Sequence, residues 1–211
     1  MKKLFDKIPD DAKENIEKKS QPDWTSPMLA TLTHEYFSDE DWIYERKLDG
    51  ERCLCFKNGK KVELKSRNKK VLNETYPELV EALEKQDAKK FVADGEIVAF
   101  DGDVTSFSKL QNRMHARESD GRNVAVYYYL FDLLHIEGYD ITGLELRYRK
   151  AILKRALSFD NKLRFTAHRN KEGEKYHQEA CKKGWEGVIA KAAASKYAHS
   201  RSKNWLKFKC V

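Results

Sequence analysis

The sequence has 211 residues, which is enough for one large domain or two small ones. With 40% hydrophobic and 36% charged residues it can form a core in water, and no apolar run approaches the roughly 20 residues that cross a bilayer, so a helical membrane protein is excluded. The net charge of +7 favours a polyanionic partner, although many ordinary proteins carry as much.

The charged N-terminal segment, the cysteines and the histidines set further expectations. Residues 1–23 are rich in Lys, Glu and Asp and predict a mobile or loosely docked lead-in before one domain over 24–211. The N-terminus lacks the apolar core of a signal peptide, which favours the cytoplasm, or a nucleus if the source has one. Neither a zinc spacing nor a secreted disulfide framework is present, so the cysteines are predicted to be free, mostly buried thiols: Cys53, Cys55, Cys181 and Cys210. Four histidines lack a partner at metal-ligand spacing and stay unassigned: His115, His168, His177 and His199.

Hydrophobic periodicity and turn residues predict short strands interleaved with helices. In chain order these are a strand over 42–46, a strand over 53–57, its hairpin partner over 61–66, a helix over 75–85, a strand over 91–100, a helix over 107–115, a strand over 124–134, a helix over 144–158, a strand over 163–167, a helix over 171–183, and strands over 187–191 and 205–209. Asn58-Gly59 predicts a type I′ turn in the hairpin, and Thr75 is the expected N-cap of the first of these helices. The pattern predicts an α+β fold with mainly antiparallel sheets.

Charged residues gather at three places in these elements. Glu45, Lys47 and Asp49 alternate, so they project to one side of an extended chain that turns at Gly50. A lysine set between carboxylates suits a nucleophile that attacks phosphorus, whereas the alternative is a solvated strand end.

The other two places are strands whose charges share a face. Asp94 and Glu96 lie on one face of an apolar strand and either face solvent or line a polar site. Lys207 and Lys209 share a face with Trp205 and repel each other unless an anion lies between them.

The segment Lys-Leu-Asp-Gly-Glu-Arg at 47–52 resembles the signature of covalent nucleotidyltransferases, namely DNA ligases, RNA ligases and mRNA capping enzymes. Further segments in the same order are Pro-Met-Leu-Ala-Thr-Leu, Ser-Arg-Asn, Asp-Gly-Glu-Ile-Val-Ala-Phe, Tyr-Leu-Phe-Asp-Leu-Leu, Glu-Gly-Val-Ile-Ala-Lys and Trp-Leu-Lys-Phe-Lys. Together they make the chain from about Pro27 to Cys210 similar to the adenylation domain of ATP-dependent DNA ligases, and most similar to the ligase domain of DNA ligase D.

The resemblance implies that Lys47 attacks the α-phosphate of ATP, forms lysyl-AMP and releases pyrophosphate. Attack needs a neutral amine, and nearby cations would lower the lysine pKa from its ordinary value of roughly 10.4. The resemblance also assigns Glu45 to the adenine edge, Phe131 to stacking on the base, and Glu96 to the ribose hydroxyls. Arg52 and Arg67 would serve the sugar and phosphate side, and Lys191, Arg201, Lys207 and Lys209 the phosphates. Glu186 would bind Mg²⁺ or Mn²⁺ from the loop before its strand, since its parity is opposite to that of Lys191.

The same resemblance implies a monomeric enzyme that acts on nicked or broken duplex DNA, with no membrane contact, near the nucleoid of a prokaryote, together with other DNA-repair proteins. DNA ligases continue after the Trp-Leu-Lys-Phe-Lys segment into an OB-fold domain, whereas this sequence ends at Val211. We therefore expect no OB-fold domain, weak sealing of DNA, and no polymerase or phosphoesterase module before the lead-in.

Three other functions stay open. A capping enzyme that uses GTP and an RNA ligase share the lysine motif, and a non-catalytic nucleic-acid-binding module would use the net charge and the basic loop at 195–204. Without the resemblance, Phe131, which lies in an apolar run, would be interpreted as a core residue. Labelling with ATP, GTP and NAD separates these functions.

Overall fold

The computed structural model describes residues 2–115 and 123–210, and Met1 and Val211 lie outside this part. Its helices are α1 Lys2–Phe5, α2 Asp10–Lys13, α3 Pro77–Glu84, α4 Phe107–His115, α5 Leu146–Ala156 and α6 Gly173–Lys182. Its strands are β1 Glu17–Lys18, β2 Leu29–Thr33, β3 Trp42–Arg46, β4 Glu51–Asn58, β5 Lys61–Ser66, β6 Lys90–Val98, β7 Phe100–Asp101, β8 Val104–Thr105, β9 Tyr127–Ile136, β10 Tyr139–Asp140, β11 Leu163–Phe165, β12 His168–Asn170, β13 Gly187–Ala192 and β14 Arg201–Lys209.

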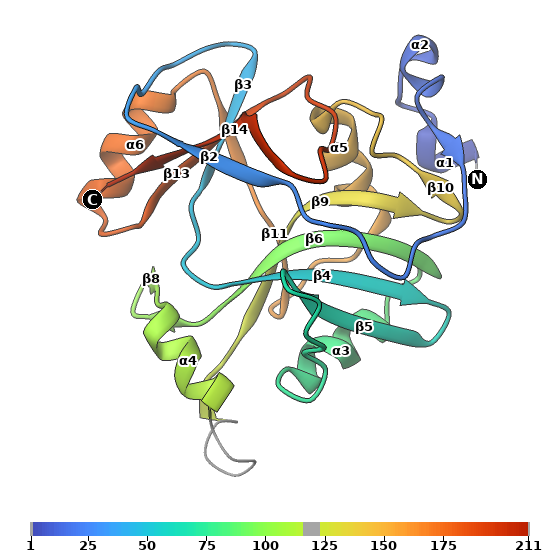
Figure 1. The fold of residues 1–211 in the computed structure, drawn as a ribbon, viewed down its shortest axis with the longest axis horizontal. Coiled ribbons are helices and arrows are strands. Elements are labelled where there is room, and N and C mark those ends of the chain that lie inside the picture. The colour runs from blue at the N-terminus through green and yellow to red at the C-terminus, as the bar shows by residue number, and fades with distance from the viewer. Residues whose placement is uncertain (1, 116–122, 211) are drawn as a thin grey trace.

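Two larger sheets carry the fold (Figure 1). A seven-stranded sheet has the order β1-β10-β9-β6-β4-β5, with β11 also paired to β9, and a five-stranded sheet has the order β12-β3-β13-β14-β2. Among the described strand pairs of these sheets, β11 with β9 and β14 with β2 are parallel and the others are antiparallel. The predicted α+β fold with mainly antiparallel sheets is therefore confirmed. No helix in the described ranges is long and apolar enough to span a membrane.

Three apolar clusters hold these layers together. The largest packs α3 and α5 against the seven-stranded sheet, a second lies between the two sheets around Phe131 and Trp205, and a third packs α6 on the five-stranded sheet around Tyr44 and Phe208. A fully buried ion pair links three of these segments. Arg149 of α5 binds Asp132 of β9 through hydrogen bonds of 2.7 and 2.9 Å and also donates to the carbonyl of Ser195. The pair thereby aligns α5, β9 and the loop that leads to β14.

Residues 2–23 are packed against the domain more closely than their charge-rich composition suggested. The side chain of Ile8 is buried in the largest cluster, the ring of Phe5 meets that of Tyr139 edge-on at 5.5 Å, and β1 extends the seven-stranded sheet. The guanidinium of Arg155 in α5 donates to the carbonyl of Leu4. Apolar residues at helical spacing, hidden among the charges, explain this docking.

Two local predictions need correction. In the β4–β5 hairpin Asn58 pairs with Lys61, so the turn residues are Gly59 and Lys60, and only Gly59 has a positive φ, of 63°. A type I′ turn needs positive φ at both positions, and lysine adopts it less readily than glycine. Helix α3 starts at Pro77 after Tyr76, without a side-chain cap, so Thr75 is not its N-cap.

The prediction of four free thiols is wrong for two of them. Cys53 and Cys55 are free and buried in β4, but Cys181 and Cys210 form a disulfide, with their Cα atoms 5.3 Å apart. The pairing of β13 with β14 returns the end of β14 to the last turn of α6, which a spacing of 29 residues does not reveal.

Candidate active site

The predicted site residues converge on a cavity of about 200 Å³ where the two sheets meet. The five-stranded sheet contributes residues of β2, β3, β13 and β14, and the seven-stranded sheet contributes residues of β4, β6 and β9. The predicted residues that line the cavity are Glu45, Lys47, Arg52, Arg67, Glu96, Phe131, Lys191, Arg201 and Lys207. Two others are not in the lining: Glu186, which reaches it through Lys47, and Lys209.

The turn after Lys47 owes its shape to Asp49 and Gly50. A Cβ atom on Gly50 would lie 2.1 Å from the carbonyl oxygen of Ile97, so only glycine permits this approach of the turn to β6. The carboxylate of Asp49 accepts a hydrogen bond of 3.0 Å from the amide of Phe107, the first residue of α4. Its own amide donates to Thr105. Asp49 and Gly50 therefore fix the backbone that presents Lys47.

Lys47 forms an ion pair with Glu186, across the start of β13. The side chains are 16% and 30% exposed, so neither is fully buried. The backbone amide of Lys47 donates to the carbonyl of Gly187 at 3.0 Å, which holds the two segments together. As predicted from strand parity, Glu186 lies just before β13 and not on the strand face of Lys191.

Glu45 is buried between two lysines. Lys150 of α5 and Lys191 of β13 each donate to its carboxylate at 2.6 Å. Burial alone would raise the pKa of Glu45, but the two ammonium groups outweigh it and hold that pKa below its ordinary value. Burial lowers the pKa of Lys191, and Glu45 opposes that shift.

Sequence reasoning missed Lys150 as a partner of this site. The feature that could have revealed it is a lysine on the buried face of an amphipathic helix. The buried residues of α5 are Leu146, Arg149, Lys150, Ile152 and Leu153. A lysine is almost never fully buried unless it is paired, so this position pointed to a buried acid.

One wall of the cavity combines an aromatic ring with two cations. The Nζ atom of Lys191 lies 4.1 Å from the ring centroid of Phe131, and the guanidinium carbon of Arg52 lies 4.8 Å from it. Trp205 meets Phe131 edge-on at 6.0 Å. Phe131 is thus both a member of the core between the sheets and part of the cavity surface.

Arg52 and Glu96 line the cavity, and Asp94, the other acid of β6, is buried behind Arg52. Arg52 binds the buried carboxylate of Asp94 through two hydrogen bonds of 2.6 and 2.7 Å, and Tyr197 donates to the same carboxylate at 2.6 Å. Burial raises the pKa of Glu96 to about 8, against the opposing effect of Arg52 and Lys47. The two predicted acids therefore have different positions: Asp94 binds Arg52, and Glu96 faces the cavity.

Three of the cations that the sequence predicted for the phosphates line the cavity. Lys207 and Arg201 of β14 line the cavity with Arg67, which follows β5. Burial lowers the pKa of Lys207, and the nearby charges of Lys47 and Arg201 lower it further. Such mutual repulsion is relieved when an anion binds between the cations.

A second groove adjoins the cavity and shares Arg46 with it. Its cations lie over aromatic rings: Arg46 is 4.2 Å from Trp185, and Arg164 is 4.1 Å from Tyr127. The buried Nε atom of Arg46 has no hydrogen-bond partner among the described residues. The groove therefore combines positive charge, π faces and an unused donor.

The fold and the lysine-centred cavity together define a covalent nucleotidyltransferase. Residues 27–209 match the family described as the ATP dependent DNA ligase domain. The multifunctional non-homologous end joining protein LigD of Pseudomonas aeruginosa is 36% identical over 196 residues, which cover 92% of this chain and 23% of that protein. The SPbeta prophage-derived DNA ligase-like protein LigB of Bacillus subtilis is 33% identical, over 87% of this chain and 67% of that protein.

Solved structures agree with the sequence matches. The mycobacterial DNA ligase D complexed with ATP and MES superposes with a TM-score of 0.74 at 32% identity, covering 88% of this chain and 60% of that chain. The ligase domain from M. tuberculosis LigD gives a TM-score of 0.75 at the same identity. This chain belongs to the ATP-dependent DNA ligase domain family. It spans about a quarter of the length of the LigD proteins it matches.

Proposed function

We propose that this chain is the adenylating unit of a DNA ligase, in which the Nζ atom of Lys47 attacks the α-phosphorus of ATP. The new N–P bond replaces the bond to the pyrophosphate oxygen, pyrophosphate leaves, and the attacking nitrogen loses its proton. The observation that carries the proposal is the convergence on one cavity of Lys47, from the turn after β3, with Glu96, Phe131 and Lys207, from β6, β9 and β14.

The cavity supplies a position for each part of the nucleotide. Phe131 offers a ring for the base, with Glu45 fixed beside it by Lys150 and Lys191. Glu96, kept protonated up to a pH of about 8, can both donate to and accept from the ribose hydroxyls. Arg52 is held by Asp94 on the sugar side, and Lys207, Arg201 and Arg67 face the phosphates. Lys209 would act only at longer range.

Glu186 is the residue proposed to hold the catalytic metal ion. It offers a partly exposed carboxylate beside Lys47, and Mg²⁺ commonly binds one or two carboxylates together with phosphate oxygens. The residues present therefore fit such an ion. Mg²⁺ or Mn²⁺ bound there would neutralise charge on the phosphate oxygens of the nucleotide.

The AMP would next pass from Lys47 to the 5′-phosphate of nicked or broken duplex DNA, and the adjacent 3′-hydroxyl would displace it. The groove of Arg46, Tyr127, Arg164 and Trp185 supports this part of the proposal. Stacking on aromatic rings and arginine planes binds exposed bases without sequence preference, and the cations attract the phosphates. We place the protein at the nucleoid, as a monomer, with other repair proteins.

Nucleotide labelling tests the proposed reaction. The protein is incubated with Mg²⁺ and α-labelled ATP, GTP or NAD, and label that survives denaturation is counted. ATP alone should label the protein. Labelling by GTP would instead indicate a capping enzyme, and no labelling by any nucleotide would indicate a non-catalytic binding module.

The DNA part has a separate test. Trp185→Ala and Arg164→Ala should each weaken the binding of nicked duplex about tenfold, because one stacked base contributes about 1–3 kcal/mol. Both should leave self-adenylation in place. Lys85→Ala, directly after α3, is the control, since it removes an exposed cation that pairs with the exposed Glu81. Equal DNA affinity in all three variants would remove the groove from the proposal.

A further inference from the structure

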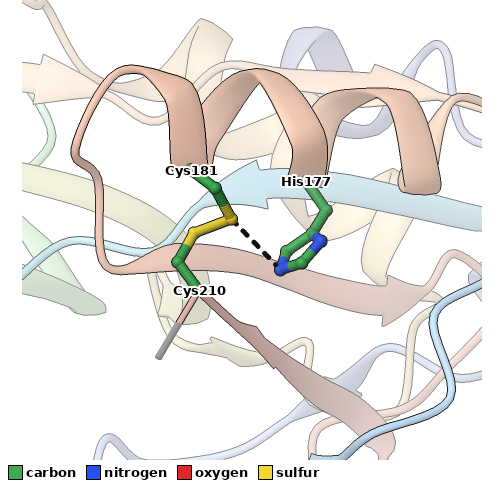
Figure 2. A group of neighbouring side chains, drawn as sticks. All are labelled: His177, Cys181 and Cys210. Atoms are coloured by element: carbon green, nitrogen blue, oxygen red, sulfur yellow. Dashed lines mark hydrogen bonds between the residues drawn. A yellow bond between two sulfur atoms is a disulfide. The ribbon is translucent and has the colours of Figure 1, made fainter.

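Three potential metal ligands meet on the far side of the five-stranded sheet from the nucleotide cavity, between α6 and the end of β14. They are His177 and Cys181 of α6 and Cys210, which follows β14 (Figure 2). Residues four apart in a helix lie on one face, so His177 and Cys181 point the same way. The amide of Cys210 donates to the carbonyl of Glu186 at 3.1 Å, which holds Cys210 opposite that face.

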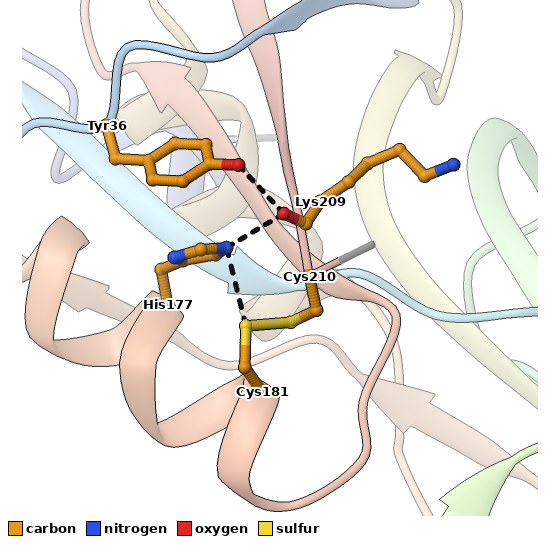
Figure 3. The surroundings of a disulfide bond; sticks show 5 residues. All are labelled: Tyr36, His177, Cys181, Lys209 and Cys210. Atoms are coloured by element: carbon orange, nitrogen blue, oxygen red, sulfur yellow. Dashed lines mark hydrogen bonds between the residues drawn. A yellow bond between two sulfur atoms is a disulfide. The ribbon is translucent and has the colours of Figure 1, made fainter.

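In this structure the cluster is oxidised, because the sulfur atoms of Cys181 and Cys210 form a disulfide bond. The Nε2 atom of His177 lies 3.5 Å from the sulfur of Cys181 and 3.0 Å from the carbonyl oxygen of Lys209 (Figure 3). A dithiol can reduce this bond by transferring two electrons and two protons, which leaves two thiols here and a disulfide on the reductant. The same position then offers two sulfurs and one imidazole.

From these observations we propose that the reduced cluster of His177, Cys181 and Cys210 binds one thiophilic divalent cation, of which Zn²⁺ is the best match. The cation would displace two protons from the thiols and take Nε2 as its third ligand. Two thiolates with one imidazole form a ligand set that zinc accepts, with a fourth position left for an oxygen ligand.

The geometry fits tetrahedral coordination. Bonds of about 2.3 Å to sulfur and 2.0–2.1 Å to nitrogen place the sulfur and nitrogen ligands about 3.5 Å apart and two sulfurs about 3.8 Å apart. The observed Cys181–His177 distance is already 3.5 Å, and the ligand atoms of all three residues lie within 4.8 Å of one another. Once the disulfide is reduced, the two sulfurs must move apart from their bonded distance to take these positions.

The imidazole is held in place for this role. The centroid of its ring lies 4.0 Å from the ring centroid of Tyr36 and 6.2 Å from that of Phe208. Tyr36 also donates to the Lys209 carbonyl at 2.9 Å, so that carbonyl keeps a partner when Nε2 turns to a cation. The same carbonyl oxygen, or a water, is placed to fill the fourth position.

The proposal is tested with the full chain and Co²⁺, whose thiolate complexes absorb by charge transfer. The protein is reduced with a phosphine, which does not bind the metal as a thiol would, and titrated with Co²⁺. The reduced chain should show a thiolate charge-transfer band that saturates at one equivalent and is lost when Zn²⁺ is added. The disulfide form should show none.

Three variants identify the ligands. We expect large losses of Co²⁺ affinity in Cys181→Ser, Cys210→Ser and His177→Gln. Mutating a residue that only supports a metal ligand typically weakens metal affinity roughly 10- to 100-fold, and removing a ligand itself should weaken it more. His34→Ala, which removes an exposed imidazole, is the control, and circular dichroism checks that every variant is folded. The free thiols of Cys53 and Cys55 remain in all of them. No thiolate band in the reduced chain, or a band that persists in both serine variants, would overturn the proposal.

Discussion

The ammonium group of Lys47 is paired with the carboxylate of Glu186, so the proposed nucleophile and the proposed metal ligand hold each other in the nucleotide-free chain. The pair joins the turn after β3 to the start of β13, and the backbone bond from Lys47 to Gly187 runs beside it. In the proposed reaction, nucleotide binding exchanges this contact for contacts with phosphate.

We expect Glu186→Gln to separate activity from stability. A partly exposed ion pair contributes only about 0–1 kcal/mol, so the free energy of unfolding should change little. Self-adenylation should fall by about 100-fold or more, as when one preorganised charge is removed from an active site. Label incorporation and urea unfolding measure the two effects. Glu81→Gln, from a surface pair with Lys85, should change neither, and a Glu186 variant that merely unfolds would contradict the assignment.

Lys207→Ala should likewise reduce the rate of adenylation by about 100-fold, with the loss in the chemical step. Stability should stay equal or rise slightly, because Lys47 and Arg201 repel Lys207 in the free protein. Single-turnover kinetics at saturating ATP measure the step. Lys203→Ala, at an exposed position of the same strand, is the matched control. A change in ATP affinity alone would mean that Lys207 binds the substrate without assisting the reaction.

The buried Glu45 cluster predicts a coupled loss of stability and activity. Lys150→Met removes one of the two ammonium groups that compensate the buried carboxylate. The free energy of unfolding should fall by about 3 kcal/mol, and adenylation should weaken because Glu45 loses its fixed orientation. Lys154→Met, at an exposed position of α5, should have little effect on either. Equal unfolding free energies for the two variants would show that Lys150 is not needed to stabilise Glu45.

Glu96 predicts a pH dependence of stability. Its folded pKa is about 8 against an ordinary value of 4.5, so between these values the folded chain keeps a proton that the unfolded chain releases. Raising the pH through this window therefore favours unfolding, and the contribution of Glu96 to stability falls. Glu96→Gln should remove that part of the slope in urea unfolding.

The control for this slope is Glu81→Gln. The hydrogen bond and charge of Lys85 keep the pKa of Glu81 below its ordinary value, so this residue does not titrate in the same window. It should show the wild-type slope. A Glu96→Gln protein whose stability still falls as steeply would mean that another group titrates there.

The sequence was most informative where the chemistry is local. Alternation along the chain predicted that Glu45 and Lys47 face the same side, and both line the cavity, whereas Asp49 belongs to the turn and bonds to Phe107 instead. Opposite parity separated Glu186 from Lys191, in agreement with the structure. Contacts between distant segments were not accessible in this way. Lys150 and Glu45 are 105 residues apart, and only the tertiary packing that sets α5 beside β3 brings them together.

Turn chemistry and helix ends were also difficult to predict. Asn58-Gly59 is a strong turn signal, but the register placed the turn one residue later, because Asn58 still pairs with Lys61. The disulfide escaped prediction for a different reason, since its half-cystines come from a helix and from the end of a strand that pairs elsewhere.

Intact-mass measurement of the Lys47→Ala variant beside the unchanged chain tests the central claim most directly. Both proteins are first treated with pyrophosphate and Mg²⁺ to remove any AMP they carry, and are then given ATP and Mg²⁺. The unchanged chain should gain the mass of one AMP, and Lys47→Ala should gain none while unfolding at the same urea concentration. An AMP adduct of equal yield on Lys47→Ala would show that another residue is the nucleophile.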